Sequence, residues 1–307
     1  MVERDDSPVR VQAFRFLETQ QRVYPNAMPW NVLSRGFDFQ GRRVPLLSQQ
    51  GIFQPAVCRL PLTIRTAPVV EGRTRPYEDE VEEEGFLAYR YRGTDRSHRE
   101  NEGLRVAMRD RVPLVYLYGV AKGWYVPAWP VFVVGDDPGS LTFRVAVGDQ
   151  TASVSGPASL ADLDLETDAA RRYATRSVLT RLHQQAFRTR VLRAYREQCA
   201  ICRLRHTELL EAAHILPDGH PEGRPIVPNG LSLCALHHAA FDGNVLGVRP
   251  DLKIEIRDKV LKEKDGPMLL HGLQGFHGAK LHVPWVEALR PRPAFLEERY
   301  EVFRKAG

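Results

Sequence analysis

The sequence predicts an α+β protein in which an arginine-rich helix joins a β-barrel-like N-terminal domain to a zinc-bound C-terminal domain. Three observations lead to this prediction. Short runs rich in β-branched and aromatic residues repeat between residues 50 and 147. The charge turns strongly positive after residue 170, and two Cys/His pairs follow from residue 199 onward. The length of 307 residues suits two domains.

Composition narrows the class of protein. Hydrophobic residues make up 43% of the chain, enough for ordinary cores, and the net charge is +5. The chain has no run of about eighteen apolar residues, and MVERDDSPVR at the start lacks the apolar core of a secretion signal. We therefore expect a cytoplasmic protein with no membrane partner. Three of the four cysteines sit in two tight motifs, with Cys58 left over, which indicates a metal site rather than a disulfide scaffold.

The N-terminal domain, residues 1–150, is predicted to form a barrel or a strongly curled sheet. Its strand candidates are separated by glycine, proline and charged turns: PLTIRT, GFLAYRYRG, VPLVYLYGV, WYVPAWPVFVV and LTFRVAV. Between two of them, HRENEGLRVAMRD places Leu104, Ala107 and Met108 at helical spacing, which predicts a helix outside the sheet. The small and acidic residues of 151–168 predict a linker.

Residues 169–307 are predicted to hold a helical connector and a second domain with its core at 187–250. Residues 171–207 contain ten arginines and a single acid, Glu197. A solvated helix face usually mixes both signs of charge, so this stretch favours a phosphate-binding surface over the alternative of a merely solvated face. Its candidate DNA-binding residues are Arg181, Arg188 and Arg190.

Two short motifs indicate a structural zinc ion. Cys199 and Cys202 in CAIC, and Cys234 and His237 in CALH, are pairs that can each place two soft ligands on one side of a tetrahedral ion. A redox dithiol is the alternative for CAIC taken alone. The second pair with matching spacing favours zinc.

The segment between the two motifs predicts a hairpin followed by a helix. One strand ends at His214, a Gly/Pro-rich loop follows, and a second strand starts after Asn229 and Gly230. Successive residues on a helix point about 100° apart, so His238 faces a different wall from His237. We expect this arrangement to bring His214, Asn229 and His238 around one pocket.

The segments CAIC, EAAHI and NGLSLCALHHAAFDGN together resemble the HNH endonuclease motif, the zinc-bound ββα-metal unit of McrA-like restriction enzymes. The resemblance covers about residues 187–250. It implies that His214 is the general base, that Asn229 orients the loop, and that His238 binds a catalytic Mg²⁺ or Mn²⁺ ion.

Phosphodiester hydrolysis needs a base for water and a cation for the developing charge. A neutral imidazole such as that of His214 serves as the base near pH 7. Many members of the family carry an aspartate directly before the first histidine, where this chain has Ala213. Glu211 is our candidate for the missing metal ligand, and Asp242 is the alternative.

A weaker resemblance covers residues 24–147. PYED, YRYRGTD and the EN that follows resemble PUA-like modules, including SRA domains, that are joined to HNH units in modification-dependent restriction enzymes. Such a domain extrudes a modified cytosine and stacks it between aromatic side chains. For each candidate aromatic residue, the alternative is an ordinary position in the hydrophobic core. The acidic run Glu78 to Glu84 suits a solvated loop. The candidate base pocket consists of Trp30, Tyr77, Asp79, Tyr91 and Asp95.

Together the resemblances imply a type IV-like restriction endonuclease that recognises 5-methylcytosine or 5-hydroxymethylcytosine in double-stranded DNA. Cutting both strands with one site per chain implies a homodimer. Two alternatives stay open. One is a zinc-stabilised DNA-binding protein without nuclease activity, which Ala213 favours. The other is an HNH nuclease whose N-terminal domain reads unmodified sequence, RNA or a protein.

Overall fold

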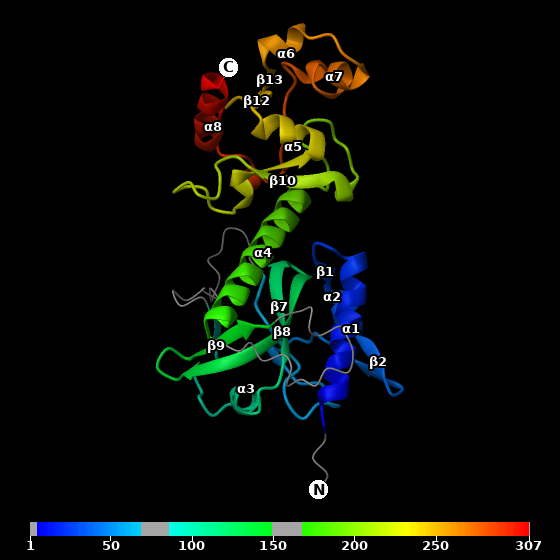
Figure 1. The fold of residues 1–307 in the computed structure, drawn as a ribbon, viewed down its shortest axis with the longest axis vertical. Helices are drawn as coiled ribbons and strands as arrows, with labels where there is room; N and C mark the ends of the chain where they lie inside the picture. The colour runs from blue at the N-terminus through cyan, green and yellow to red at the C-terminus, as the bar shows by residue number, and fades with distance from the viewer. Residues whose placement is uncertain (1–4, 69–85, 149–167, 307) are drawn as a thin grey trace. The chain divides into compact units, whose positions relative to one another are not determined.

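The computed structural model describes residues 5–68, 86–148 and 168–306 (Figure 1). The chain folds as two compact units, an N-terminal unit, Met1–Ala186, and a C-terminal unit, Phe187–Gly307. The division falls within helix α4 (Asp168–Ala194), the arginine-rich helix that the sequence predicts. Nearly all of the predicted linker lies outside the described residues.

A curled sheet forms the centre of the N-terminal unit (Figure 1). Five of its strands coincide with the predicted runs. Their order is β4 (Ile52–Phe53), β5 (Thr63–Arg65), β7 (Leu114–Ala121), β8 (Trp124–Asp137), β9 (Thr142–Val147) and β6 (Leu87–Arg90), and β1 (Met28–Pro29) also pairs with β8. Neighbours are antiparallel except for β5 and β7.

Irregularities in pairing curl the sheet. The register shifts between Leu114 and Tyr116, between Gly119 and Ala121, and between Val133 and Gly135. Such bulges increase the local twist of a strand. Within the described residues the two edge strands, β4 and β6, do not pair with each other, so the sheet is a half-barrel. A closed barrel and the PUA/SRA-like assignment stay predictions.

Helices and a small hairpin complete the N-terminal unit. The predicted helix outside the sheet is α3 (Arg99–Arg109). The sequence analysis missed α1 (Ser7–Val23), although its apolar residues recur at helical spacing and are buried: Val9, Ala13, Phe14 and Leu17. The other elements are α2 (Trp30–Arg35) and a hairpin of β2 (Phe37–Phe39) and β3 (Arg42–Val44).

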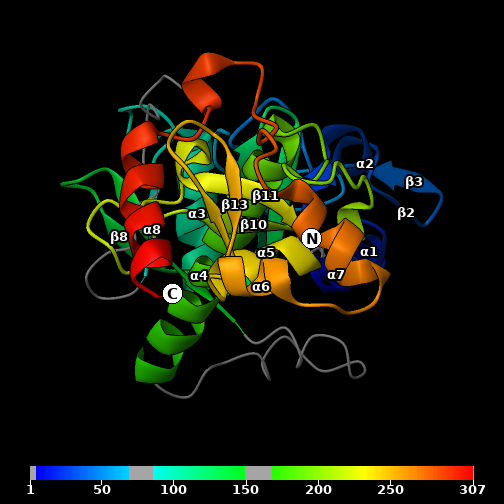
Figure 2. The same ribbon diagram turned by 90° about the horizontal axis from the view of Figure 1, so that it is seen from above.

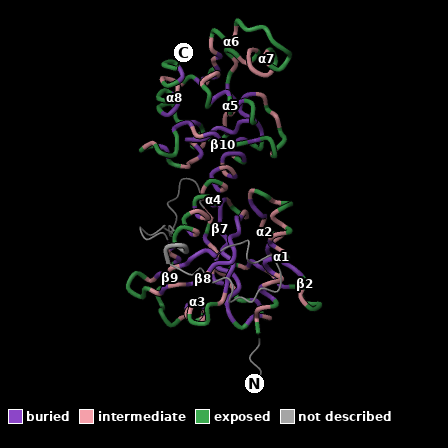
Figure 3. Tube along the Cα trace, viewed as in Figure 1, coloured by how far each residue is buried: buried purple, intermediate pink, exposed green. Residues whose placement is uncertain are grey.

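The centre of the C-terminal unit is the predicted hairpin and helix. After a 3₁₀ turn, η2 (Thr207–Leu209), strand β10 (Leu210–His214) pairs antiparallel with β11 (Gly230–Cys234), and α5 (Ala235–Asp242) follows directly. The register sets His214 opposite Gly230. Both strands contribute to one buried cluster together with the end of α4 (Figure 3).

The rest of this unit packs around that ββα arrangement. A second hairpin is formed by β12 (Leu246–Val248) and β13 (Ile254–Ile256), and helix α8 (Pro293–Lys305) packs against β12 (Figures 1 and 2). Shorter elements are η3 (Val227–Asn229), α6 (Asp258–Lys262), α7 (Pro267–Gly272), η4 (Gln274–Phe276) and η5 (Glu287–Leu289). Among the described helices, none has both the length and the apolar composition that a membrane crossing requires.

Candidate active site and zinc centre

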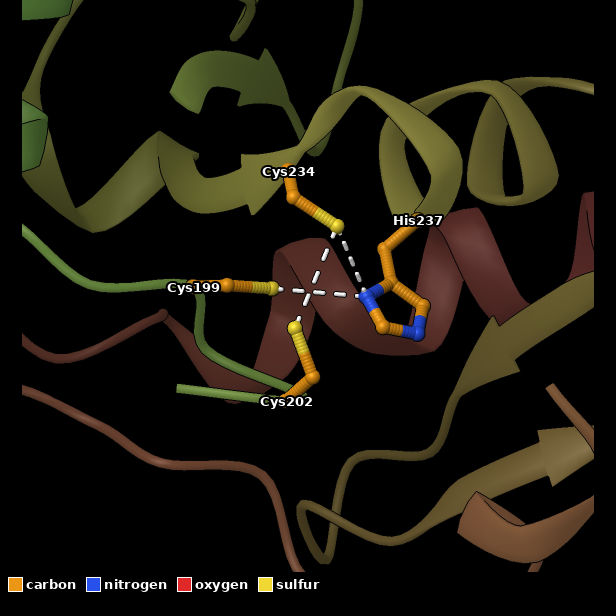
Figure 4. Close-up of side chains that lie close together, drawn as sticks. All are labelled: Cys199, Cys202, Cys234 and His237. Atoms are coloured by element: carbon orange, nitrogen blue, oxygen red, sulfur yellow. Dashed lines mark hydrogen bonds between the residues drawn. The ribbon is translucent and has the colours of Figure 1, made fainter. Parts of the chain in front are cut away.

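The four predicted zinc ligands converge on one point (Figure 4). Cys199 and Cys202 lie in the turn after α4, Cys234 ends β11, and His237 lies in the first turn of α5. His237 Nδ1 is 3.4 Å from Cys199 Sγ and 3.1 Å from Cys234 Sγ, and the Sγ atoms of Cys202 and Cys234 are 3.9 Å apart. Ligands of a tetrahedral zinc ion are separated by about 3.5 to 3.8 Å. The cluster can therefore hold a metal such as zinc.

The surroundings also suit a metal. The second ring nitrogen of His237, Nε2, is 2.8 Å from the Gly272 carbonyl oxygen. If it carries the proton and donates to that carbonyl, the lone pair of Nδ1 is left for the ion. Hydrogen bonds from the Cys199 and Cys202 thiols hold the pKa of the Cys234 thiol far below its ordinary value. A thiolate, the form that binds metal, is thus already favoured.

His214 lies at the end of β10 with one ring nitrogen unused. Its ring stacks on Phe187 of α4, with centroids 4.1 Å apart and planes 17° apart. Its Nε2 atom is buried and has no hydrogen-bond partner. Burial also lowers the pKa of His214 below its ordinary value. Burial therefore favours the neutral imidazole, which is the form that can take a proton.

Asn229 fixes the chain that follows His214. The side chain is fully buried, and its Oδ1 accepts a hydrogen bond of 2.9 Å from the Leu216 amide. Its Nδ2 donates to the carbonyls of Leu216 and Arg224, at 3.0 and 3.2 Å. Its own carbonyl accepts from the Ile215 amide at 2.9 Å. These contacts tie both sides of the loop together, and the orienting role of Asn229 in catalysis stays a prediction.

His238 lies between two carboxylates. Its Nδ1 contacts Glu211 of β10, and its Nε2 is 3.2 Å from Asp242 one helical turn later on α5. His238 and Asp242 both lie near enough to His214 to affect its pKa. Imidazole and carboxylate are a donor set that suits Mg²⁺ or Mn²⁺. The two carboxylates contact opposite nitrogens of the His238 ring, so their oxygens do not gather at one point. Among the described residues, the Cys/His cluster is the one group whose ligand atoms lie close together.

The predicted DNA-binding arginines differ in exposure. Arg188 donates from Nη2 to the carbonyls of Thr207 and Leu210, at 3.0 and 2.6 Å, and Arg190 donates to Pro225 at 2.8 Å. The two guanidinium groups thus connect α4 to the start of β10 and to the loop between β10 and β11. Arg181 is exposed and contacts Ser177 of its own helix. Phosphate contacts by the three arginines stay a prediction.

The residues of the predicted base pocket are only partly described, since Tyr77, Asp79 and the acidic run Glu78 to Glu84 lie outside the described residues. Trp30 is half-buried, with the Arg65 guanidinium 5.5 Å from its ring centre. Asp95 is exposed and accepts from the Ser97 amide at 2.9 Å.

Tyr91 belongs to the core, where its ring stacks on Phe143 at 4.5 Å. Its hydroxyl contacts Asp136 and accepts from Arg105 at 2.9 Å. The base pocket therefore stays a prediction.

Sequence reasoning missed Phe187 as a partner of His214. The residue lies directly before the arginine pair at 188 and 190, and its apolar spacing on α4 predicts only a core position. The stacking depends on where β10 meets α4, which no local pattern encodes. The sequence around Phe187 therefore gave no signal for its contact with His214.

We expect one zinc ion per chain, and we expect Cys199→Ser to lose it. Removing one of four ligands leaves an incomplete site, and folding of a small metal-stapled unit is coupled to binding. Metal analysis and thermal unfolding check both points. Cys58→Ser is the matched control, because Cys58 is buried in the N-terminal unit. Full zinc content in Cys199→Ser would contradict the assignment.

Comparisons with known proteins show which proteins this chain resembles. A family model described as HNH endonuclease matches residues 199–249, from the first predicted zinc ligand, Cys199, to just beyond β12. Among solved structures, the chain is similar to one titled "Modification dependent TagI restriction endonuclease", at 15% identity and a TM-score of 0.29, covering 79% of this chain and 81% of that one. No curated protein matches. The C-terminal unit contains an HNH endonuclease domain, and the chain is a DNA endonuclease.

Proposed function

We propose that the chain is a modification-dependent restriction endonuclease. Its HNH site hydrolyses phosphodiester bonds in double-stranded DNA, and its N-terminal unit recognises 5-methylcytosine or 5-hydroxymethylcytosine. The observation that carries the nuclease assignment is the partly buried imidazole of His214, stacked on Phe187 and near His238 with its two carboxylates. The resemblance of residues 24–147 to PUA-like modules supports the choice of modified cytosine.

His214 acts as the general base. Its neutral ring takes a proton from a water molecule, and the resulting hydroxide attacks phosphorus while the bond to the leaving oxygen breaks. The stacked Phe187 ring and the Asn229 hydrogen bonds hold the imidazole and the following loop in place. A base whose orientation is fixed in advance loses little entropy at the moment of reaction.

His238 and Glu211 are the residues that would hold the catalytic metal. If Nε2 of His238 carries the proton, it donates to Asp242, and the lone pair of Nδ1 then faces the side where Glu211 lies. In this assignment Asp242 orients the His238 imidazole, and Glu211 and His238 would both be ligands of the ion. When bound there, Mg²⁺ or Mn²⁺ supplies positive charge to the phosphate and the leaving oxygen.

DNA binding and assembly follow from the same proposal. The exposed Arg181 guanidinium suits a contact with a phosphate, which positions DNA without reading sequence. One site per chain cuts one strand at a time, so a homodimer is proposed to cut both. The second candidate function, an HNH nuclease whose N-terminal unit reads unmodified DNA, RNA or a protein, is favoured by the place of Tyr91 in the core.

We expect His214→Ala to lower kcat for DNA cleavage by about 10² to 10⁴, the range for loss of a general base. Gel assays with plasmid DNA and Mg²⁺ or Mn²⁺ measure this loss, and circular dichroism and zinc content check the fold. His206→Ala is the matched control because its side chain is exposed and contacts Glu208. Wild-type protein that retards DNA without nicking it would instead support a binding module.

Cleavage is expected to fall on the acid side of neutral pH. Burial lowers the pKa of His214 below 6.5, so the neutral base predominates at pH 7 and is lost as the pH drops through the lowered value. Phe187→Leu reduces the cover over the ring, and we expect it to move this acid limb upward. A pH profile of kcat/KM reports the limb for the free enzyme. An acid limb above 6.5 in the wild type contradicts His214 as the buried base.

Cleavage is also expected to depend on base modification. A pocket that fits the 5-methyl or 5-hydroxymethyl group would favour modified DNA by about 1 to 3 kcal/mol, or roughly tenfold or more. One DNA sequence is prepared with plain, methylated and hydroxymethylated cytosine, and initial cutting rates are compared. Equal rates on all three would remove the modified-cytosine proposal while leaving the nuclease intact.

A further inference from the structure

Helix α8 lies beyond residues 199–249, the part of the chain that matches the HNH endonuclease model. One of its side chains, Arg299, nevertheless reaches the end of the nuclease helix α5. Its Nη1 donates to the Asn244 side-chain oxygen at 2.6 Å, and its Nη2 donates to the Phe241 carbonyl. The guanidinium also lies over the Phe241 ring, 4.4 Å from its centre. Three contacts from one side chain thus hold the residues on both sides of Asp242.

The end of α5 needs such a partner. The last carbonyls of a helix have no hydrogen-bond donor within it, and the negative end of the helix dipole attracts a cation. Here the chain turns sharply after Asp242, since Asn244 has a φ of 52° in the left-handed region. The Arg299 fork joins the last turn of α5 to this turn. The guanidinium therefore fixes the backbone at the point where the Asp242 side chain starts.

Asp242 connects this contact to the active site. Its carboxylate is 3.2 Å from His238 Nε2. Burial lowers the pKa of Arg299, and the charge of Asp242 opposes that effect, so the two groups lie within electrostatic reach. A small shift at the end of α5 would move the carboxylate that orients His238, and supporting groups of this kind tune both metal affinity and activity.

We infer that Arg299 is a positioning residue of the nuclease site: it holds Asp242, which in turn orients His238 toward the catalytic metal. This inference rests on the proposed function. Arg299 does not touch the reacting atoms, so its loss is expected to change metal affinity and kcat and to leave the KM for DNA unchanged.

The test compares variants of the full-length, zinc-loaded protein. Arg299→Gln removes the charge and the double contact. Asn244→Gly removes one acceptor of the fork and keeps the left-handed backbone, which glycine adopts without strain. Arg304→Gln is the matched control, an arginine on the same helix that is exposed and pairs with Glu301. For each protein, electron paramagnetic resonance measures Mn²⁺ binding without DNA, and cleavage assays give kcat and KM across Mn²⁺ concentrations.

For Arg299→Gln we expect roughly tenfold weaker Mn²⁺ binding and a kcat lower by about tenfold, within the range found for residues that support metal ligands. Asn244→Gly is expected to shift both values in the same direction by a smaller factor. In the double variant, Arg299→Gln with Asn244→Gly, the two losses should not add, because both substitutions remove the same contact between Arg299 and Asn244. Arg304→Gln should match the wild type, and zinc content should be equal in all of these proteins.

Two outcomes would overturn the inference in different ways. If Arg299→Gln melts at a lower temperature but keeps wild-type Mn²⁺ binding and kcat, Arg299 is only structural. If zinc-loaded wild-type protein neither binds Mn²⁺ nor cleaves DNA, the proposed function fails and the inference fails with it. Arg299→Lys guards against misfolding. With the charge kept and the planar fork lost, it should fold and still show weaker Mn²⁺ binding.

Discussion

The Cys₃His cluster is the constraint on which the nuclease unit depends. It joins the turn after α4, the end of β11 and the first turn of α5, and these are the segments that carry or adjoin the proposed catalytic side chains. Two five-residue strands and an eight-residue helix are short elements that hold together poorly in isolation. A metal held by these four side chains would fix the start of α5 against β11. His238 follows His237 on that helix, so fixing one imidazole also sets the direction of the other.

Around that fixed start, the rest of the site is held by backbone contacts. Asn229 fastens the chain after His214, and Arg188 fastens β10 to α4. Arg299 holds the far end of α5. The helix that carries His238 is thus restrained at both ends, by the cluster at its start and by a guanidinium at its finish. Short elements can hold side chains in place when their ends are fixed in this way.

Residue spacing and turn residues in the sequence predicted those helices and strands that form from contiguous stretches of the chain. The ligand spacing and the turn at Asn229 and Gly230 predicted the hairpin and α5, and the β-rich runs predicted five strands of the half-barrel. The spacing at Val9, Ala13, Phe14 and Leu17 carried a signal for α1 that was not used. The contact of Asp242 with His238 follows from four-residue spacing on a helix, so it too was within reach.

Other contacts had no local signal. The pairing of Glu211 with His238 depends on where β10 lies against α5, and Arg299 meets Phe241 from 58 positions further along the chain. Such meetings depend on tertiary packing, and side-chain pattern alone does not specify it. The curvature of the sheet was equally hard to foresee, because bulges in β7 and β8 decide it.

Ala213 shows how a chain that departs from the usual motif can still assemble a donor set. The residue is fully buried in the core of the C-terminal unit. A carboxylate buried there would need compensation for lost hydration. Here the carboxylates come instead from two exposed residues, Glu211 on β10 and Asp242 at the end of α5, which approach His238 from opposite sides. At exposed positions these carboxylates avoid that cost of burial. Under the proposed function, the departure at Ala213 corresponds to a relocated acidic ligand rather than to a lost one, provided that α5 is held where Asp242 and Glu211 can both reach His238.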